Sequence, residues 1–483
     1  MKTKTVAIAT LGTVAAIALG YALYFDQKRR NDPDFRKKLK REKKKIAKKA
    51  KQSADTIKQK VSETLEAGLE AVNQEEFPTS VDEKEKFFMS QISAGETLCA
   101  QGEEHYFEAA MCFFRAQKVY PSPVELIMIY QKTVPEPVFQ LVVGMMTLEH
   151  QKRQDGFYKE FPPEDMNVKI EDIPEGTNGE GSTVMRKGLV VTKDFEEGDV
   201  IFVEEPIVSA LNTKLEGGDF CNYCLKDITG DKVECANCDQ VVFCSQECYE
   251  KANEEYHQYL CTNNKTNENA ASSQEQAFLD YSKDKNVKYP YLIARFLATM
   301  VHDEIEKAKS GVTDGYGSWD HVDRFRYLEL APTDQNMKEL KLIKELLGPK
   351  VTGVEEFLTE ERFLMLKGKI LFNAYSVQSI GKAEKAIEKS TELHRESQAD
   401  LSSVGSALYR ATTYLAHSCE PNSKIEFADK SHKLTVKATK PLKKGDELNT
   451  SYIQLEDKNT EQRRNQLAEL FQFKCVCPKC ESD

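Results

Sequence analysis

The sequence predicts a multidomain α+β protein, with an N-terminal transmembrane helix, a small all-α domain, and a β-rich domain that carries zinc sites and a helical insert. Three observations lead to this prediction. A run of twenty uncharged residues lies near the N-terminus, apolar residues recur at helical spacing over 85–147, and cysteines cluster in pairs between 221 and 261. At 483 residues the chain is too long for one core, since domains usually hold about 100 to 200 residues.

The uncharged run extends from Val6 to Phe25, which is long enough to cross a hydrocarbon core of about 30 Å as a helix. A secretory signal peptide would have a shorter apolar region of roughly 7 to 15 residues and a small-residue cleavage site. This run ends in aromatic residues instead, and Lys28, Arg29 and Arg30 follow it directly. We therefore assign 1–25 to an uncleaved anchor and expect the basic flank and all that follows to face the cytosol.

The formal charge of -11 conceals a basic block, because residues 26–60 hold 16 Lys and Arg against 5 Asp and Glu. We interpret 26–75 as a solvated basic stalk, helical or disordered, that spaces the anchor from the first domain. A whole-chain pI near 5.5 argues against a general nucleic-acid binder.

Residues 76–150 are expected to form the small helical domain. The apolar spacing predicts two amphipathic helices separated near Gly102, with further helices beginning after Pro123 and at Pro137. Prolines, glycines and acidic residues over 151–180 then predict a linker. Beyond it, residues 188–205 alternate apolar and polar around Glu197 and Gly198, as two short strands would, and a β-rich domain is assigned to 181–483.

Thirteen cysteines carry the strongest chemical signal. In a reducing cytosol, clustered cysteines are metal ligands before they are disulfides, and zinc prefers four thiolate or imidazole ligands. Four consecutive pairs supply eight ligands: Cys221 and Cys224, Cys235 and Cys238, Cys244 and Cys248, and His257 and Cys261. A third site is expected from Cys475, Cys477 and Cys480 with Cys419 as the fourth ligand, which leaves Cys99 and Cys112 as buried apolar residues.

The order of the four pairs over 221–261 resembles the MYND finger. That resemblance implies that the first and third pairs share one zinc ion and that the second and fourth share another. A MYND finger is otherwise a protein-docking module without chemistry of its own.

The N-terminal part resembles the twenty-kilodalton import receptor of the mitochondrial outer membrane translocase, the TOM complex. The resemblance rests on the anchor, the basic stalk, AQG at 100–102 and YPSPVELIMIYQKTVPEPVFQ at 120–140, and it spans most of 1–150. It implies a tetratricopeptide-like fold in the outer membrane, whose apolar groove binds the amphipathic presequences of precursor proteins, with other translocase subunits as partners. The candidate presequence-binding residues are Phe107, Met111, Ile127, Ile129, Val138 and Phe139. The sequence does not separate groove from core, and for any single one of them the core is favoured.

The C-terminal part carries AHSCEPN, GDELNTSY and FKCVCPKC in the order of a SET domain. With the inserted finger, residues 181–483 resemble the SET and MYND protein-lysine methyltransferases. This implies S-adenosylmethionine as cofactor, a helical insert over 270–400 and a cysteine-rich post-SET segment over 471–483. The matching catalytic residue is Tyr452, Asn422 would buttress the crossed segments, and the matching cofactor contacts are Lys187, Gly188, Asn373 and His417.

Two positions depart from that family's pattern, because Arg186 and Ala416 stand where glycine and asparagine are usual. A lost amide at 416 costs on the order of 1 to 3 kcal/mol if it leaves a buried group unpaired. Three functions therefore remain open: a receptor with a methyltransferase, a receptor with an inactive docking module, or chiefly a membrane-anchored methyltransferase.

Overall fold

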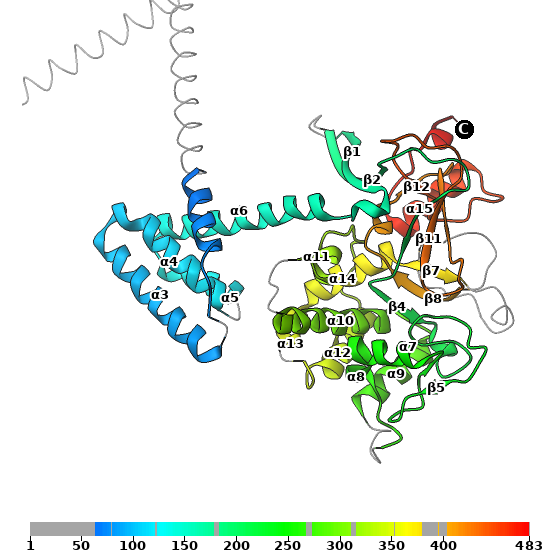
Figure 1. Cartoon of the computed structure of the whole chain (residues 1–483), viewed down its shortest axis with the longest axis horizontal. Coiled ribbons are helices and arrows are strands. Elements are labelled where there is room, and N and C mark those ends of the chain that lie inside the picture. Colours follow the sequence, from blue (N-terminus) through cyan, green and yellow to red (C-terminus); the bar gives the residue numbers. More distant parts are fainter. Residues whose placement is uncertain are drawn as a thin grey trace, which may run out of the picture. The chain divides into compact units, whose positions relative to one another are not determined.

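The computed structural model describes residues 63–78, 80–120, 123–177, 183–266, 273–310, 315–351, 353–378, 395 and 403–482. These belong to two compact units, which divide between Gly156 and Phe157 (Figure 1). The predicted anchor Val6–Phe25 and most of the predicted stalk lie outside the described residues. Among the described helices, none is long and apolar enough to span a bilayer.

The first unit is entirely helical in its described part. A helical segment at 63–73 precedes α3 (Val81–Gln101), the 3-10 turn η1 (Glu103–His105), α4 (Tyr106–Val119), α5 (Pro123–Thr133) and α6 (Glu136–Glu160), whose last turn, from Phe157, is assigned to the second unit. Ser80 caps α3 by accepting the N–H of Glu83, and Gly102 ends that helix at a φ of 118°, which favours glycine. The break near Gly102 and the helices that begin at Pro123 and around Pro137 confirm the sequence prediction.

The predicted linker over 151–180 differs from the structure. Residues up to Glu160 continue α6, the 3-10 turn η2 (Glu164–Met166) follows, and 168–177 form strand β1 (Val168–Thr177). The prolines have local roles instead. Pro162 and Pro163 stand where the helix has ended, and Pro174 adjoins a register shift of β1, where a missing N–H does not interrupt a central ladder.

The second unit is built around short antiparallel sheets. One pairs β1 with β2 (Thr183–Val191), the second has the order β10 (Ser423–Glu426), β11 (Leu434–Ala438), β3 (Val200–Glu204), and the third β4 (Val208–Leu211), β8 (Ser403–Leu408), β7 (Tyr375–Gln378). The two strands predicted within 188–205 are the end of β2 and β3, with Gly198 in the turn at a φ of 90°. The 3-10 turn η7 (Thr412–Tyr414) follows β8, and β9 (Ala416–His417) runs parallel to β12 (Asn449–Thr450).

Helices flank these sheets (Figure 1). The described part of the insert contains α9 (Gln274–Lys285), α10 (Tyr289–Ser310), α11 (Ser318–Asp323), α12 (Asp334–Leu347), α13 (Val354–Phe357) and α14 (Glu360–Asn373). The expected insert, 270–400, is too long at its C-terminal end, because 375–378 pair with β8 as strand β7. Such a short strand directly after a helix offers too few residues for an alternating pattern to be read from sequence.

The cysteine-rich region has little regular structure of its own. It holds the two-stranded sheet of β5 (Val233–Glu234) and β6 (Val242–Phe243), then α7 (Gln246–Ala252), the π-helical turn η4 (Asn253–His257) and α8 (Gln258–Leu260). After β12 come α15 (Thr460–Phe471) and α16 (Pro478–Ser482). The 3-10 turn η3 (Thr213–Leu215) leads from β4 into the finger.

Candidate zinc centres and methyl-transfer site

The finger brings its eight predicted ligands into two tetrads. Their ligand atoms lie within 4.8 Å of one another in each of two groups: Cys221, Cys224, Cys244 and Cys248; and Cys235, Cys238, His257 and Cys261. The first and third pairs therefore share one site and the second and fourth share the other, as the resemblance implied. In the first tetrad the Sγ atoms of Cys224 and Cys244 are 3.6 Å apart. Zinc with Zn–S bonds of about 2.3 Å would separate its thiolates by about 3.8 Å, so the donor set fits that ion.

The third tetrad joins Cys419 to Cys475, Cys477 and Cys480 across a long stretch of chain. Its Sγ–Sγ distances from Cys419 are 3.9 Å to Cys475 and 3.5 Å to Cys480. Hydrogen bonds from the Cys419 thiol and from His417 lower the pKa of Cys475, which favours the thiolate that a metal binds. Cys112 is buried and Cys99 half-buried, and neither belongs to a tetrad.

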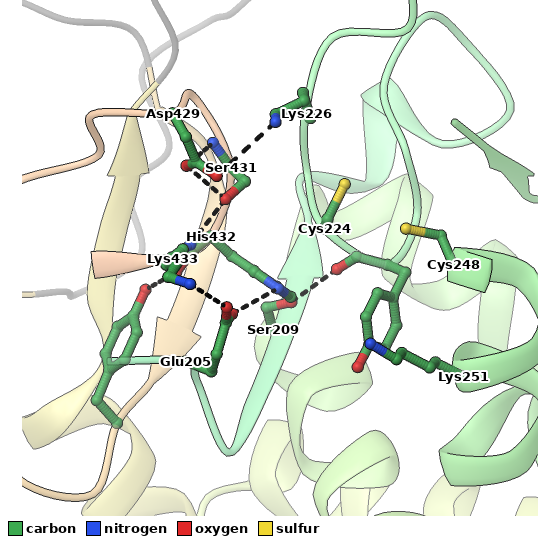
Figure 2. A network of polar contacts seen from close by, with 12 residues as sticks. Glu205, Ser209, Cys224, Lys226, Cys248, Lys251, Asp429, Ser431, His432 and Lys433 are labelled. Carbon is green, nitrogen blue, oxygen red and sulfur yellow. Dashed lines mark hydrogen bonds and ion pairs between the residues drawn. The ribbon is translucent and has the colours of Figure 1, made fainter. Parts of the chain in front are cut away.

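A polar network fixes the first finger tetrad to the sheets (Figure 2). The Oγ atom of Ser209 on β4 lies 2.8 Å from Nδ1 of His432 and donates to the carbonyl of Tyr223. The main-chain N–H of His432 donates to the carbonyl of Cys224 over 2.8 Å. Burial lowers the pKa of His432 to about 4, so the imidazole is neutral at physiological pH. A neutral, hydrogen-bonded side chain thus holds the finger at the edge of β4.

A buried carboxylate positions the turn η7. Glu204, the last residue of β3, accepts the main-chain N–H groups of Arg410, Ala411 and Thr412 at 2.7 to 3.0 Å. The Thr412 hydroxyl donates to the same carboxylate over 2.6 Å. Four donors compensate the desolvated charge, and they fix the chain immediately before the residues of the candidate site.

Tyr452 lies where two of the resembling motifs run side by side. Ala416 and His417 pair in parallel with Asn449 and Thr450. The buried Tyr452 donates its main-chain N–H to Nδ1 of His417 over 3.1 Å and its hydroxyl to the carbonyl of Leu415 over 2.6 Å. Because that hydroxyl proton is directed at a carbonyl, the lone pairs of the phenol oxygen remain available to accept an N–H.

Asn422 braces the same crossing. Its main-chain N–H donates to Asn449 Oδ1, its Oδ1 accepts from the N–H of Asn449, and its Nδ2 donates to the carbonyl of Glu447. These three hydrogen bonds match the buttressing role that the sequence suggested for this residue.

Three aromatic rings surround the phenol of Tyr452 in addition to His417. Their centroids lie 5.3 Å away for Phe471, 6.1 Å for Phe473 and 6.2 Å for Phe372. The hydroxyl is therefore presented within an apolar wall formed by α14, α15 and the segment that follows α15.

Gly188 on β2 lies in a tight cradle. A Cβ atom there would meet three side-chain atoms at 2.8 Å, Arg186 Nη1, Glu447 Oε1 and Ile173 Cγ1, so only glycine fits without movement. Arg186 and Glu447 form an ion pair of 2.5 Å across this glycine. The residue that departs from the family pattern thus covers one face of Gly188. Lys187 pairs with Asp172 at 2.9 Å and lies over the ring of Tyr158.

Asn373 is the last residue of α14, and its amide is fully engaged within the protein. Its Nδ2 donates to the carbonyls of Arg326 and Lys369. Its Oδ1 accepts from Thr413 Oγ1 at 2.6 Å and from Arg395 Nη2 at 3.0 Å. An amide makes at most four such hydrogen bonds, so a ligand would meet this residue through its main chain.

Arg395 is a site residue that the sequence analysis missed. Its guanidinium carbon lies 4.0 Å from the centroid of the Tyr452 ring. No motif surrounds it in the sequence, and only the hydrogen bond to Asn373 and the ring contact identify it.

The structure separates the six candidate presequence-binding residues by exposure. Val138 is fully buried and Met111 nearly so, while Ile129 on α5 is 49% exposed beside Met128, which is 52% exposed. Phe107 and Met111 contact Gly68 of the preceding helical segment. Ile127 and Phe139 are half-buried. Val138 and Met111 thus belong to the core, and Ile129 is available to a partner.

Comparisons with known proteins match both parts of the chain. Residues 8–159 match the family described as MAS20 protein import receptor, and residues 186–453 match the SET domain. Mitochondrial import receptor subunit tom20 of Neurospora crassa is 40% identical over 143 residues, 29% of this chain and 78% of that protein. A SET and MYND domain-containing protein of Dictyostelium discoideum is 25% identical over 340 residues, 68% of this chain and 92% of that protein. Protein-lysine N-trimethyltransferase SMYD5 of Homo sapiens is 24% identical over 380 residues, 62% of this chain and 84% of that protein.

Proposed function

Since the chain belongs to the SET-domain family through its larger part and to the MAS20 import receptors through its N-terminal part, we propose a combined function. The protein is a presequence receptor of the mitochondrial outer membrane that carries an S-adenosylmethionine-dependent protein-lysine methyltransferase. The receptor part would work with other subunits of the translocase. Incoming precursor proteins are then the methyl acceptors nearest to the SET unit, because the receptor binds them on the same chain.

The observation that carries the methyltransferase is the placement of Tyr452. Its hydroxyl donates to the carbonyl of Leu415, and three phenylalanine rings, of Phe372, Phe471 and Phe473, pack around the phenol. The phenol oxygen can therefore accept an N–H of a lysine amine and direct the nitrogen lone pair along one line. When bound, S-adenosylmethionine supplies the electrophilic methyl group. The protein's own contribution is to hold the neutral amine in position and to exclude water from it.

The site fits a cofactor that is contacted mainly through the main chain. The side chains of Asn373, His417 and Lys187 already bind protein groups, and Ala416 offers no amide. Because Gly188 has no side chain, the cofactor could contact this residue only through its main chain, on the side that Arg186 and Glu447 do not cover. Lys187, Gly188, Ala416 and His417 would thus hold the cofactor chiefly by their N–H and C=O groups.

The observation that carries the receptor is the exposed apolar pair Met128 and Ile129 on α5. Adjacent exposed apolar side chains of this size suit one face of an amphipathic targeting helix. The matched family and the tom20 relatives support the same role.

A second candidate function is a receptor whose SET unit only docks proteins. The Arg186–Glu447 pair over Gly188 and the missing amide at Ala416 favour it. Calorimetric titration of the full chain with S-adenosylmethionine separates the two functions, because a docking module would bind no cofactor.

The decisive experiment gives the detergent-solubilised full chain radiolabelled S-adenosylmethionine and a mitochondrial precursor protein. We expect label on lysines of the precursor, and loss of at least 100-fold in rate with Tyr452→Phe. A precursor without its presequence is the matched control, and it should be labelled more slowly if receptor binding delivers the substrate. Absence of label with every protein substrate would refute the enzyme, while fluorescence anisotropy of a labelled presequence peptide judges the receptor independently.

A further inference from the structure

A buried positive charge lies against the phenol of Tyr452. The guanidinium of Arg395 is 1% exposed and donates to the carbonyls of Phe372 at 2.9 Å and Thr413 at 3.2 Å. It also donates to Asn373 Oδ1 at 3.0 Å and to the hydroxyl of Tyr375 at 3.2 Å. Its main chain is fixed as well, since Arg395 N–H donates to Ala374 and its carbonyl accepts from Ser376.

The hydrogen-bond acceptors that surround this guanidinium are all neutral oxygen atoms. Within the part of the chain that the structure describes, no carboxylate lies within ion-pair distance of Arg395. The rings of Tyr452, Phe372 and Tyr375 lie 4.0, 5.0 and 5.5 Å from the guanidinium carbon. Among the described residues, only neutral acceptors and ring faces solvate this buried charge, and none of them is an anion that would cancel its field.

We propose that Arg395 is a positioning residue for methyl transfer, which holds the Tyr452 ring in place and whose charge keeps an acceptor lysine amine neutral. This inference rests on the proposed methyltransferase. Only a neutral amine has the lone pair that attacks a methyl group, and a like charge nearby lowers the pKa of an amine. By favouring the neutral amine, the charge of Arg395 would remove the need for a general base that takes a proton from the substrate lysine.

Other groups around Tyr452 also contribute to the potential at that amine. His417 packs against the ring at 5.4 Å, and its Nε2 lies 3.3 Å from Cys419 Sγ of the third tetrad. Arg463 from α15 donates to Cys480 of the same tetrad, and Arg326 lies over Phe372. These groups are the same in the wild type and in a variant at 395, so a comparison of the two isolates the effect of Arg395.

The test uses the full chain with Arg395→Met, which removes the charge, and Arg395→Lys, which keeps it. Arg362→Met is the matched control, because Arg362 also lies over a ring, that of Phe357 at 4.8 Å, and donates to a carbonyl. Zinc content and melting temperature select variants that fold. With Arg395→Met we expect the acid limb of the kcat profile, which reports the bound amine, to move up by about one pH unit. Arg395→Lys should lower the maximum rate without moving that limb, and Arg362→Met should change neither.

A second measurement does not depend on activity. With fluorotyrosine incorporated, the fluorine NMR signal of Tyr452, assigned by its loss in Tyr452→Phe, should shift in Arg395→Met and keep its position in Arg362→Met. If the wild type transfers no methyl groups, the proposed enzyme fails and this signal alone judges the positioning role. An unmoved signal overturns that role, and an unmoved acid limb in an active Arg395→Met variant overturns the electrostatic role.

Discussion

The main-chain N–H of Tyr452 donates to Nδ1 of His417, and this hydrogen bond determines which nitrogen of the imidazole carries its proton. Because an N–H can only donate, Nδ1 is the acceptor, and Nε2 therefore carries the hydrogen. The Nε2 atom lies 3.3 Å from Cys419 Sγ. One histidine thus connects the candidate catalytic tyrosine to the third metal tetrad. Zinc binding there would orient the ring on which Tyr452 rests.

That connection predicts different results for two ligand substitutions. Cys477→Ser should reduce zinc from three ions to two per chain and lower methyl transfer at least tenfold, because His417 loses its fixed neighbour. Cys238→Ser, in the finger, should also remove one zinc but leave the transfer rate within about twofold. Metal analysis by mass spectrometry and the labelled-methyl assay measure both effects, with Cys99→Ser as the control that keeps three ions. Equal rate losses in the two ligand variants would contradict the connection through His417.

Arg186 predicts a gain of affinity on substitution. In Arg186→Gly the ion pair over Gly188 is lost and the cradle opens, so S-adenosylmethionine should bind about tenfold more tightly, or ~1.4 kcal/mol. Arg186→Lys retains a cation beside Glu447 and should bind nearly as the wild type does. Calorimetry on the full chain measures both. Weaker binding by Arg186→Gly would mean that the guanidinium contacts the cofactor instead of covering its site.

Exposure predicts separate effects for two apolar residues of the receptor unit. Ile129→Ser should weaken binding of a presequence peptide about tenfold and leave the melting temperature unchanged, because this side chain is half exposed. Val138→Ala should cost about 2 kcal/mol of stability, because this side chain is fully buried. Fluorescence anisotropy and thermal unfolding distinguish the two. An Ile129→Ser variant that unfolds early but binds peptide normally would place Ile129 in the core.

His321 predicts a loss of stability in acid. Burial, with Arg410 and Arg324 nearby, lowers its pKa to about 3 from an ordinary value near 6.5. The unfolded state then binds more protons below pH 6.5, so the stabilisation is complete above that pH and is lost as the pH falls toward 3. At pH 5 the loss is about 2 kcal/mol. Urea unfolding of the wild type and of His321→Gln measures this, and between pH 7 and pH 5 the variant should lose about 2 kcal/mol less stability than the wild type. Parallel pH curves would contradict a buried neutral imidazole.

Sequence reasoning was most successful where spacing along the chain determines the chemistry. The ligand pairs of the finger were predicted from spacing, because paired cysteines a few residues apart reach one ion whatever fold surrounds them. Which of these pairs share an ion was implied by the resemblance to the MYND finger. Gly102 and Pro123 likewise mark helix ends by local geometry alone. For these elements the neighbouring residues contain enough information.

The residues that were missed depend on contacts between distant parts of the chain. Arg395 has no motif around it, and its role comes from Tyr452, which lies 57 positions away. Asn373 was expected to contact the cofactor, and its sequence context gives no sign that its amide oxygen accepts hydrogen bonds from Thr413 and Arg395. Prolines over 151–180 suggested a linker, but they follow a helix end or adjoin an irregular position of an edge strand. The roles of these residues depend on which distant residues the fold brings into contact with them, and a single sequence does not specify those contacts.

The hydrogen bonds to the Glu204 carboxylate have a consequence for the order of folding. The N–H groups that donate to this carboxylate lie about two hundred residues further along the chain. The hydrogen-bonding contact between Ser209 and His432 spans 223 positions. Contacts this distant form late, because closing a long loop costs entropy before any contact compensates it. The helices of the receptor unit depend on contacts that are closer in sequence, such as the ion pair of Arg115 with Glu75, which spans 40 positions. We therefore expect a newly made chain to acquire them first. Pulse-labelling hydrogen exchange during refolding would show protection in α3 and α4 before β4 and β8, and the reverse order would contradict this expectation.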